Sequence, residues 1–292
     1  MITHKKITFI GGDARQITAA RMLSSEGYRT STLCGGAVGG ELERYDTLLD
    51  ALTESDVIVL PLPVSVDGRL LNAPFLEGER IELSKMVEAI PAGKMVIGGR
   101  IPQATVDALE AKRASVIDYF KSEAFQIENA YTTSEAALSI AMNNLRKNIR
   151  GASFAVTGYG RIARTLTELL LKLGGKVCVL ARKESDRTWA RLVGAEAKRV
   201  DEESILSLAQ GYDVIFNTIP TWLFLGDFLL LVDPATLIVD LASSPGGVDV
   251  SAAKKLSSNV LWASSLPGKY APESAGALIC NCIKSIVSEV DI

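Results

Sequence analysis

The sequence of 292 residues contains a single histidine, His4. Enzymes that oxidise 2-hydroxy acids normally use a histidine to donate or accept the reacting proton. His4 precedes the first predicted strand, where we expect an exposed side chain that is poorly placed for this role. The scarcity of histidine therefore argues against a general 2-hydroxy-acid dehydrogenase and limits the residues that can move a proton.

Positive charge is not in excess either, because the formal net charge is -3 and the pI is near 5.5. Without a basic stripe, nucleic acid is excluded as a main partner. A membrane-spanning helix needs about 18 apolar residues, whereas the longest apolar stretch, residues 222–232, contains Gly226 and Asp227. The first residues lead directly into a predicted strand, without the pattern of a signal peptide. We therefore expect a cytoplasmic protein with no membrane partner.

The cysteines include no C-x-x-C pair. Two of them are spaced so that they would face different sides of a helix, which disfavours a shared metal or disulfide. Reduced, mostly buried thiols in a cytosolic protein are the expected state. The four are Cys34, Cys178, Cys280 and Cys282.

The most informative stretch is residues 153–164, SFAVTGYGRIAR. A β-prone run leads into Gly158, Gly160 and Ala163, which have the G-x-G-x-x-A spacing, and a helical pattern follows at once. This order predicts a strand, a tight turn and a helix whose free N–H groups face the phosphates of a dinucleotide. The alternative is a tight turn of purely structural use. The predicted cofactor contacts in this stretch are Gly158, Tyr159, Gly160, Arg161 and Ile162.

The next predicted strand, residues 176–181, ends in Arg182 and Lys183. An NAD-binding fold normally offers an acidic residue to the ribose hydroxyls at this point. Two cations suit a 2′-phosphate instead, so the sequence favours NADP over NAD. The alternative is that both are solvated loop charges. We also expect a turn near the nicotinamide at the end of a later strand, formed by Asn217, Thr218, Ile219 and Pro220.

The first half shows a different turn after its first strand, GGDARQ at residues 11–16. Asp13 is predicted to cap the helix, where its carboxylate would repel a phosphate, so we do not expect a second dinucleotide site. Arg15 lies in the first helical turn, where a cation opposes the helix dipole, which suggests contact with a ligand carboxylate. The alternative is a solvated surface arginine. Arg100 places another cation after the fourth predicted strand.

Strands alternate with helices in both halves, which predicts an α/β protein with two Rossmann-like, doubly wound parallel sheets joined by a long helix. The predicted domains are residues 1–130 with a returning helix at 274–292, a linker at 131–150, and an NADP-binding domain at 151–273. The linker pattern predicts a helix over residues 133–148. Thr133, Ser134 and Glu135 would begin this helix, either facing a ligand or only capping it.

Four motifs in this order resemble one family, the A subunit of dipicolinate synthase from spore-forming bacteria, over essentially the whole chain. They are IGGDARQ at 10–16, NTIP at 217–220, DLASSPGG at 240–247 and LPGKYAPESAG at 266–276. Within residues 129–137 the sequence departs from the family's Pro-Thr-x-Glu-Gly pattern. Thr132 stands for the proline and Ala136 for the glycine, which affects the expected hinge geometry.

The resemblance implies an NADP-dependent oxidoreductase subunit that oxidises dihydrodipicolinate, or its hydroxytetrahydro precursor, to pyridine-2,6-dicarboxylate during sporulation. It also implies a flavoprotein-like partner, the B subunit of dipicolinate synthase, and we expect a homo-oligomer. Aromatisation drives such an oxidation, so cations that clamp a dicarboxylate and a weak proton acceptor would suffice. The candidate catalytic residues are Arg15, Arg100, Glu135, Ser243 and Lys269. Two alternatives remain, namely an NADP-binding scaffold whose partner performs the chemistry, and an enzyme similar to 2-hydroxy-acid dehydrogenases.

Overall fold

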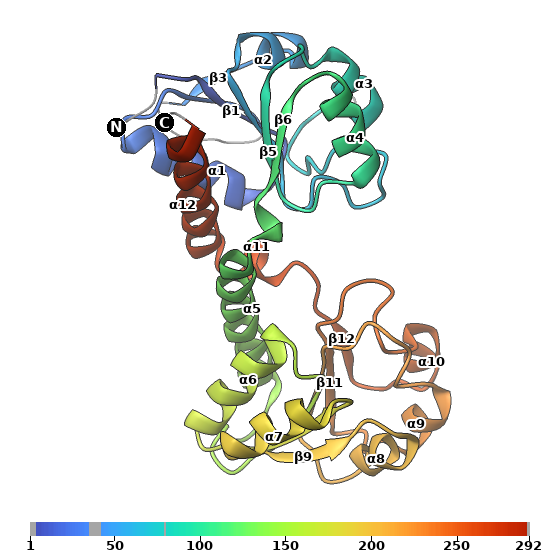
Figure 1. The fold of residues 1–292 in the computed structure, drawn as a ribbon. Helices are drawn as coiled ribbons and strands as arrows, with labels where there is room; N and C mark the ends of the chain where they lie inside the picture. Colours follow the sequence, from blue (N-terminus) through green and yellow to red (C-terminus); the bar gives the residue numbers. More distant parts are fainter. Residues whose placement is uncertain (1–3, 35–41, 79, 291–292) are drawn as a thin grey trace. The chain divides into compact units, whose positions relative to one another are not determined.

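The computed structural model describes residues 4–34, 42–78 and 80–290. The chain divides into two compact units, a first unit of Met1–Asn129 with Ala271–Ile292 and a second unit of Ala130–Tyr270. The predicted domain ranges include residues 1–3, 35–41, 79 and 291–292, which lie outside the described part. Helix α5, Glu123–Asn144, contains the boundary between the two units (Figure 1).

The first unit is built on a six-stranded parallel sheet with the order β3-β2-β1-β4-β5-β6. Helices lie on both faces of the sheet, so its strands are buried on both sides and consist largely of apolar residues. Consecutive residues such as Phe9 and Ile10 accordingly belong to different core clusters. The strands are β1 Ile7–Ile10, β2 Thr30–Leu33, β3 Glu43–Arg44, β4 Val57–Val59, β5 Met95–Gly98 and β6 Ser115–Asp118. The helices are α1 Ala14–Ser25, α2 Leu48–Glu54, α3 Leu83–Ala89, α4 Gln103–Ala111, the short η1 Tyr119–Lys121, and α12 Pro272–Val290.

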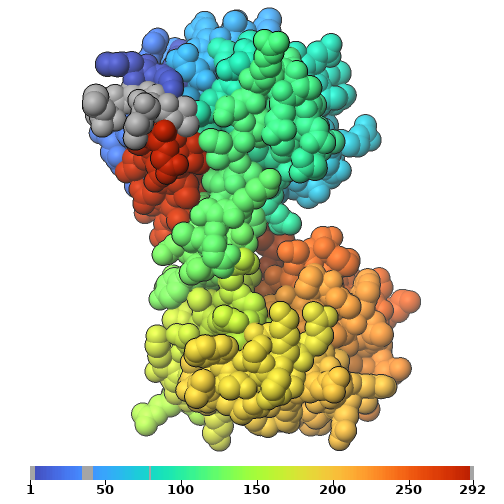
Figure 2. Space-filling view, in the orientation of Figure 1, coloured from blue at the N-terminus to red at the C-terminus, as the bar shows by residue number. Residues whose placement is uncertain are grey.

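The last helix, α12, returns from the end of the chain and packs against α1 (Figures 1 and 2). The two backbones approach closely at Gly276, where an added Cβ would lie 2.6 Å from Cβ of Thr18 and 2.8 Å from the carbonyl oxygen of Arg15. Ile279 and Ile283 then enter the same core cluster as Phe9. The C-terminal helix is therefore part of the first unit's hydrophobic core.

The second unit repeats the same topology, with a six-stranded parallel sheet in the order β12-β11-β10-β7-β8-β9. In both sheets the strand order reverses beside the first strand, which creates a topological switch point between β1 and β4 and between β7 and β10. The strands are β7 Ser153–Thr157, β8 Lys176–Ala181, β9 Glu196–Arg199, β10 Val214–Asn217, β11 Leu237–Asp240 and β12 Val260–Trp262. The helices are α6 Arg161–Lys172, α7 Glu184–Leu192, α8 Glu202–Leu206, η2 Ser207–Ala209, α9 Gly226–Leu231, α10 Val250–Lys255 and α11 Leu266–Tyr270.

The predicted fold class, two doubly wound parallel sheets joined by a long helix, is confirmed. One boundary is wrong, because α5 begins at Glu123 and not near Thr133. Ser134 therefore does not cap the helix. It is buried and donates its hydroxyl to the carbonyl of Ala130, four residues earlier. Serine and threonine resemble caps in a sequence, but they are tolerated inside a helix when the hydroxyl bonds to that carbonyl.

Two elements of the first unit, β3 and α2, were not predicted from the sequence. Strand β3 has only two residues and both are exposed, so no apolar alternation marks it. Among the described residues, no helix is long and apolar enough to cross a membrane. The same residues contain no group of three or more acidic, cysteine or histidine side chains that could hold a metal ion.

Candidate functional site

The turn after β7 is formed by two glycines with different constraints. Gly158 has a φ of +92°, and an added Cβ would collide with the hydroxyl of Thr218. Gly160 precedes α6 as its N-cap residue, and an added Cβ would meet no atom within 4 Å. Gly158 is thus required by the fold of the turn itself, whereas the space beside Gly160 is open.

The N-terminus of α6 has no side chain that caps it by a hydrogen bond. Its first N–H groups and the positive end of the helix dipole therefore face the open space beside Gly160. Tyr159 is buried, and the guanidinium of Arg164 lies 5.2 Å from the centre of its ring. Only the backbone of Tyr159 is available to a ligand, and burial raises the pKa of its phenol. This geometry fits the pyrophosphate of a dinucleotide.

Arg182 and Lys183 are exposed at the carboxyl end of β8, as the sequence predicted. The backbone before them is held by Arg187, whose Nη1 donates to the carbonyl oxygens of Ala181 and Arg182 at 2.8 Å each. Glu184 follows directly, but its carboxylate is bound by Arg191 and Arg187, which lower its pKa. The carboxylate that could accept from ribose hydroxyls is therefore already occupied. Sequence reasoning missed this arrangement because residue spacing does not show where three exposed side chains point.

The turn after β10 lies beside the fingerprint turn, since β10 pairs with β7. Asn217 is fully buried, while Thr218 and Ile219 are half-buried and Pro220 is exposed. The side chain of Asn217 donates to Asp240, at the end of the neighbouring strand β11. Ser243, in the loop after β11, is exposed. These residues therefore meet at one edge of the second sheet, as their positions after parallel strands predicted.

The corresponding turn of the first unit is closed. The amide of Gly12 donates to the carbonyl oxygen of Asn72 at 2.8 Å, and an added Cβ on Gly11 would lie 3.0 Å from the side chain of Leu71. Asp13 caps α1, as predicted, by accepting from the amide of Arg15. The phosphate position of the first sheet is therefore filled by the chain itself, in contrast to the open turn at Gly160.

The two predicted arginines of the first unit differ in accessibility. The Arg15 side chain is only 6% exposed, because its guanidinium is paired with Asp13 and donates to the carbonyl oxygen of Leu62 at 2.5 Å. Arg100 is exposed and has the left-handed φ of 55°. Both oxygens of Asp118 hold this turn by accepting from the amides of residues 100 and 101, and the guanidinium lies over the ring of Phe120. A strained, exposed cation at the carboxyl edge of a sheet is typical of a functional position.

The remaining predicted residues, Glu135 and Lys269, both lie in the second unit. Glu135 is exposed in the middle of α5, and Lys269 is exposed in the short helix α11. Both side chains are therefore accessible to a ligand, and their roles in catalysis stay predictions.

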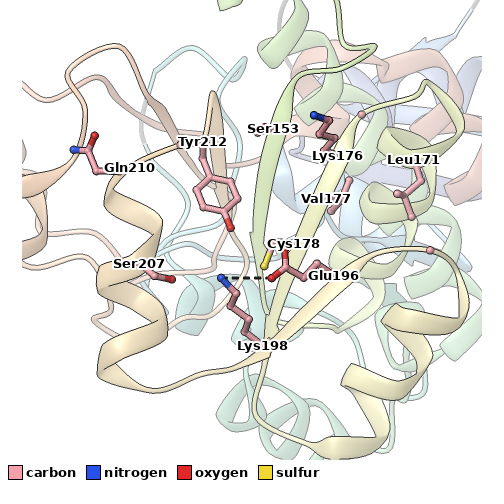
Figure 3. Close-up of a pocket in the computed structure, with 13 residues that line it drawn as sticks. Ser153, Leu171, Lys176, Val177, Cys178, Glu196, Lys198, Ser207, Gln210 and Tyr212 are labelled. Carbon is pink, nitrogen blue, oxygen red and sulfur yellow. Dashed lines mark ion pairs between the residues drawn. The ribbon is translucent and has the colours of Figure 1, made fainter.

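A groove of about 620 Å³ lies at the opposite, amino edge of the second sheet (Figure 3). Its walls include the first residues of β7 and β8 together with Tyr212, and Lys198 in it is paired with Glu196 at 3.5 Å. Ligands of doubly wound sheets bind outside the carboxyl ends of the strands. We therefore place the candidate site at the open turn of Gly160 and not in this groove.

Comparison with known proteins agrees with the geometry. The family model for the N-terminal domain of the A subunit of dipicolinate synthase matches residues 6–120. The dipicolinate synthase A subunit of Bacillus subtilis (strain 168) is 29% identical over 299 residues, which cover 99% of this chain and 98% of the relative. The chain belongs to the family of dipicolinate synthase A subunits.

Solved structures place this family member among known folds. The crystal structure of the dipicolinate synthase A subunit from Bacillus halodurans is similar with a TM-score of 0.84 and 27% identity, over 98% of each chain. A structure of L-alanine dehydrogenase has a TM-score of 0.63 at 12% identity, covering 96% of this chain and 88% of that one. The second similarity shows a shared dehydrogenase-like fold and nothing more specific.

Proposed function

We propose that the chain is the NADP-dependent dehydrogenase subunit of dipicolinate synthase. The observation that carries this proposal is the open turn at Gly160, before the uncapped N-terminus of α6, in a chain of this family. The closed turn of the first unit gives the contrast, because the same topology there leaves no room for a phosphate. A dinucleotide is thus bound by the second unit alone.

The second unit's residues would hold the cofactor from both ends. The amides at the start of α6 bind the pyrophosphate, and Arg182 with Lys183 bind a 2′-phosphate. Arg187 and Arg191 hold the carboxylate of Glu184, so its negative charge is neutralised next to these cations. These three contacts favour NADP over NAD. The bound cofactor supplies a hydride acceptor.

The proposed reaction converts dihydrodipicolinate into pyridine-2,6-dicarboxylate. The ring loses a hydride and a proton, and the gain of aromaticity favours product. Arg100 is the best-placed cation for one substrate carboxylate, because it is exposed and its backbone is fixed by Asp118. Glu135 and Ser243 are the candidate proton acceptors, and Lys269 a further cation. Arg15 would orient its surroundings from within the ion pair with Asp13.

The experiment is a turnover assay with dihydrodipicolinate and NADP, performed with and without the B subunit of dipicolinate synthase. We expect NADPH and dipicolinate to form in equal amounts. Arg100→Ala should abolish most turnover while NADP still binds. If NADP binds but NADPH is formed in neither assay, the chain is a nucleotide-binding scaffold. If keto acids are reduced by NADPH instead, it is related in function to 2-hydroxy-acid dehydrogenases.

We further propose that the chain forms a homo-oligomer that binds the B subunit in the cytoplasm of a sporulating cell. The support is the family to which the chain belongs, whose name implies a second subunit. Size-exclusion chromatography with light scattering, first of the chain by itself and then of the mixture, tests both parts of this proposal. A monomeric mass would contradict the homo-oligomer, and a mixture that elutes as two separate species would contradict a stable complex.

A further inference from the structure

Three polar residues end three neighbouring strands of the second sheet in register. Asn217 of β10 is aligned with Thr157 of β7 on one side and with Asp240 of β11 on the other. All three are at most 2% exposed. Thr157 Oγ1 donates to Asn217 Oδ1 at 2.6 Å, and Asn217 Nδ2 donates to Asp240 Oδ1 at 2.8 Å. A continuous hydrogen-bonded row therefore crosses the carboxyl edge at the switch point.

Two members of this row also fix the backbone that follows their strands. Asn217 Oδ1 accepts from the amide of Ile219 at 3.1 Å, and its Nδ2 donates to the carbonyl oxygen of the same residue at 3.0 Å. Asp240 Oδ1 accepts from the amide of Ala242 at 3.1 Å, and Oδ2 accepts from the amide of Gly247 at 2.8 Å. One amide and one carboxylate thus set the geometry of both turns.

Two glycines show how closely these turns enclose the pair. Gly246 has a φ of +86°, and an added Cβ would lie 2.7 Å from Asp240 Oδ2. An added Cβ on Gly247 would collide with Asn217 Nδ2 and would lie 2.9 Å from the carbonyl oxygen of Ile219. The loop after β11 can therefore wrap around the carboxylate only with glycine at these positions.

The chemistry of the pair is not what packing alone would select. In the described part of the chain no lysine or arginine forms an ion pair with Asp240, so its buried carboxylate is held by N–H donors only. Burying a carboxylate is costly, and an apolar pair of similar shape is often at least as stable. What hydrogen bonds add is directional control over the attached backbone.

We propose that Asn217 and Asp240 are positioning residues for hydride transfer. They touch neither cofactor nor substrate. They fix the turn at residues 218–220 and the loop that carries Ser243 and Ser244, which flank the switch point where the nicotinamide half of a dinucleotide lies in this fold. This inference rests on the proposed function, and it assigns the family's NTIP and DLASSPGG motifs a common mechanical role.

The test exchanges the two side chains. Asn217→Asp and Asp240→Asn each remove the amide–carboxylate bond, whereas the double exchange restores it with the two partners reversed and keeps an acceptor for Gly247. We expect each single variant to lower kcat about 10-fold to 100-fold and the double variant to recover most of the loss. The Kd of NADP should stay within about twofold throughout, because α6 and Arg182 hold the phosphates.

A second readout does not depend on turnover. NADPH fluorescence reports the surroundings of the bound nicotinamide, so each single variant should lose the emission change of the wild type at saturating protein, and the double variant should restore it. Asp233→Asn is the matched control, because Asp233 also accepts a backbone amide, that of Ala235, but in an exposed turn away from this edge. Thr157→Val removes only the outer bond of the row and serves if a single variant does not fold; its kcat should fall by a smaller factor.

The outcomes separate this inference from the proposed function. Wild-type kcat and emission in all folded variants would overturn the inference alone, as would a double variant no better than the weaker single one. A parallel loss of NADP affinity would also overturn it, since that result indicates a cofactor contact or general unfolding. A wild-type protein that binds NADPH with the emission pattern described, but does not turn over substrate, contradicts the proposed function only. Failure of the wild type to bind NADPH would overturn both.

Discussion

The guanidinium of Arg15 pairs with the carboxylate of Asp13 at two points, with Nε 2.9 Å from Oδ1 and Nη2 2.8 Å from Oδ2. The residue that caps α1 therefore brings its own cation with it. Together with Asn72, which accepts from the amide of Gly12, this pair fills the place where the second sheet has its open turn. Two sheets of identical topology are thus divided into one with a phosphate position and one without.

This pair leads to a prediction about stability. Asp13→Ala leaves the largely buried Arg15 without its counter-ion, and removing one partner of such a pair costs about 3 kcal/mol or more of unfolding free energy. Urea unfolding measures the change. Because Asp13 belongs to the first unit, the Kd of NADP for the folded protein should not change. A loss of NADP binding without a loss of stability would contradict the assignment of the cofactor to the second unit.

The two glycines of the fingerprint turn should respond differently to alanine. Gly158→Ala imposes a left-handed φ on alanine and a collision with Thr218, so we expect a lower melting temperature. Gly160→Ala meets no atom of the chain, so the melting temperature should stay the same while the Kd of NADP rises at least about 10-fold, since the methyl group occupies the phosphate's space. Calorimetry and titration of both variants test this, and equal NADP affinity of Gly160→Ala and wild type would contradict the site.

Arg182 should determine the choice between NADP and NAD. Replacing it by Asp removes a charged hydrogen bond worth about 1.5–3 kcal/mol, which corresponds to a loss of roughly one to two orders of magnitude in NADP affinity. The affinity for NAD should change little. Lys172→Ala is a suitable control, because Lys172 is an exposed lysine at the other end of α6. An unchanged ratio of the two Kd values would show that Arg182 is only a solvated loop charge.

Arg100 and Arg113 form a natural pair for testing the substrate contact. Both are exposed arginines with a left-handed φ, of 55° and 60°, but Arg100 follows β5 at the carboxyl edge whereas Arg113 precedes β6 at the amino edge. Arg100→Ala should reduce kcat/KM for dihydrodipicolinate at least about 10-fold, with the Kd of NADP unchanged. Arg113→Ala should leave both constants unchanged. Equal effects of the two substitutions would exclude Arg100 as a carboxylate contact.

The cysteines predict how stability depends on alkaline pH. Burial raises the pKa of Cys34 to about 11 and that of Cys280 to about 11, from an ordinary value near 9. Between these values the folded protein keeps both thiol protons while the unfolded chain loses them. The stabilisation from these two thiols is therefore fully present below about pH 9 and falls as the pH rises towards 11. Urea unfolding at a series of pH values measures this, and Cys280→Ala should make the decline shallower.

Much of the fold was readable from the sequence, because buried parallel strands leave apolar runs and glycines mark the turns between them. The fingerprint around Gly158 and the cations Arg182 and Lys183 lie within one βαβ unit, where short-range spacing fixes their relation. The start of α5 was wrong because Ser134 has the residue type of a cap but the environment of a core. The strand β3 left no signal, since two exposed residues cannot show alternation.

The sequence by itself determined the fold class, the turn that can approach a phosphate and the family, because these depend on local backbone preferences and on the order of motifs. Only the tertiary structure decided that Arg15 is paired with Asp13, that Arg187 and Arg191 occupy Glu184, and that Asn217 and Asp240 form one pair. Each of these relationships depends on which side chains parallel strands and helices bring within hydrogen-bonding distance. Residues 23 positions apart, such as Asn217 and Asp240, meet only once the sheet has formed.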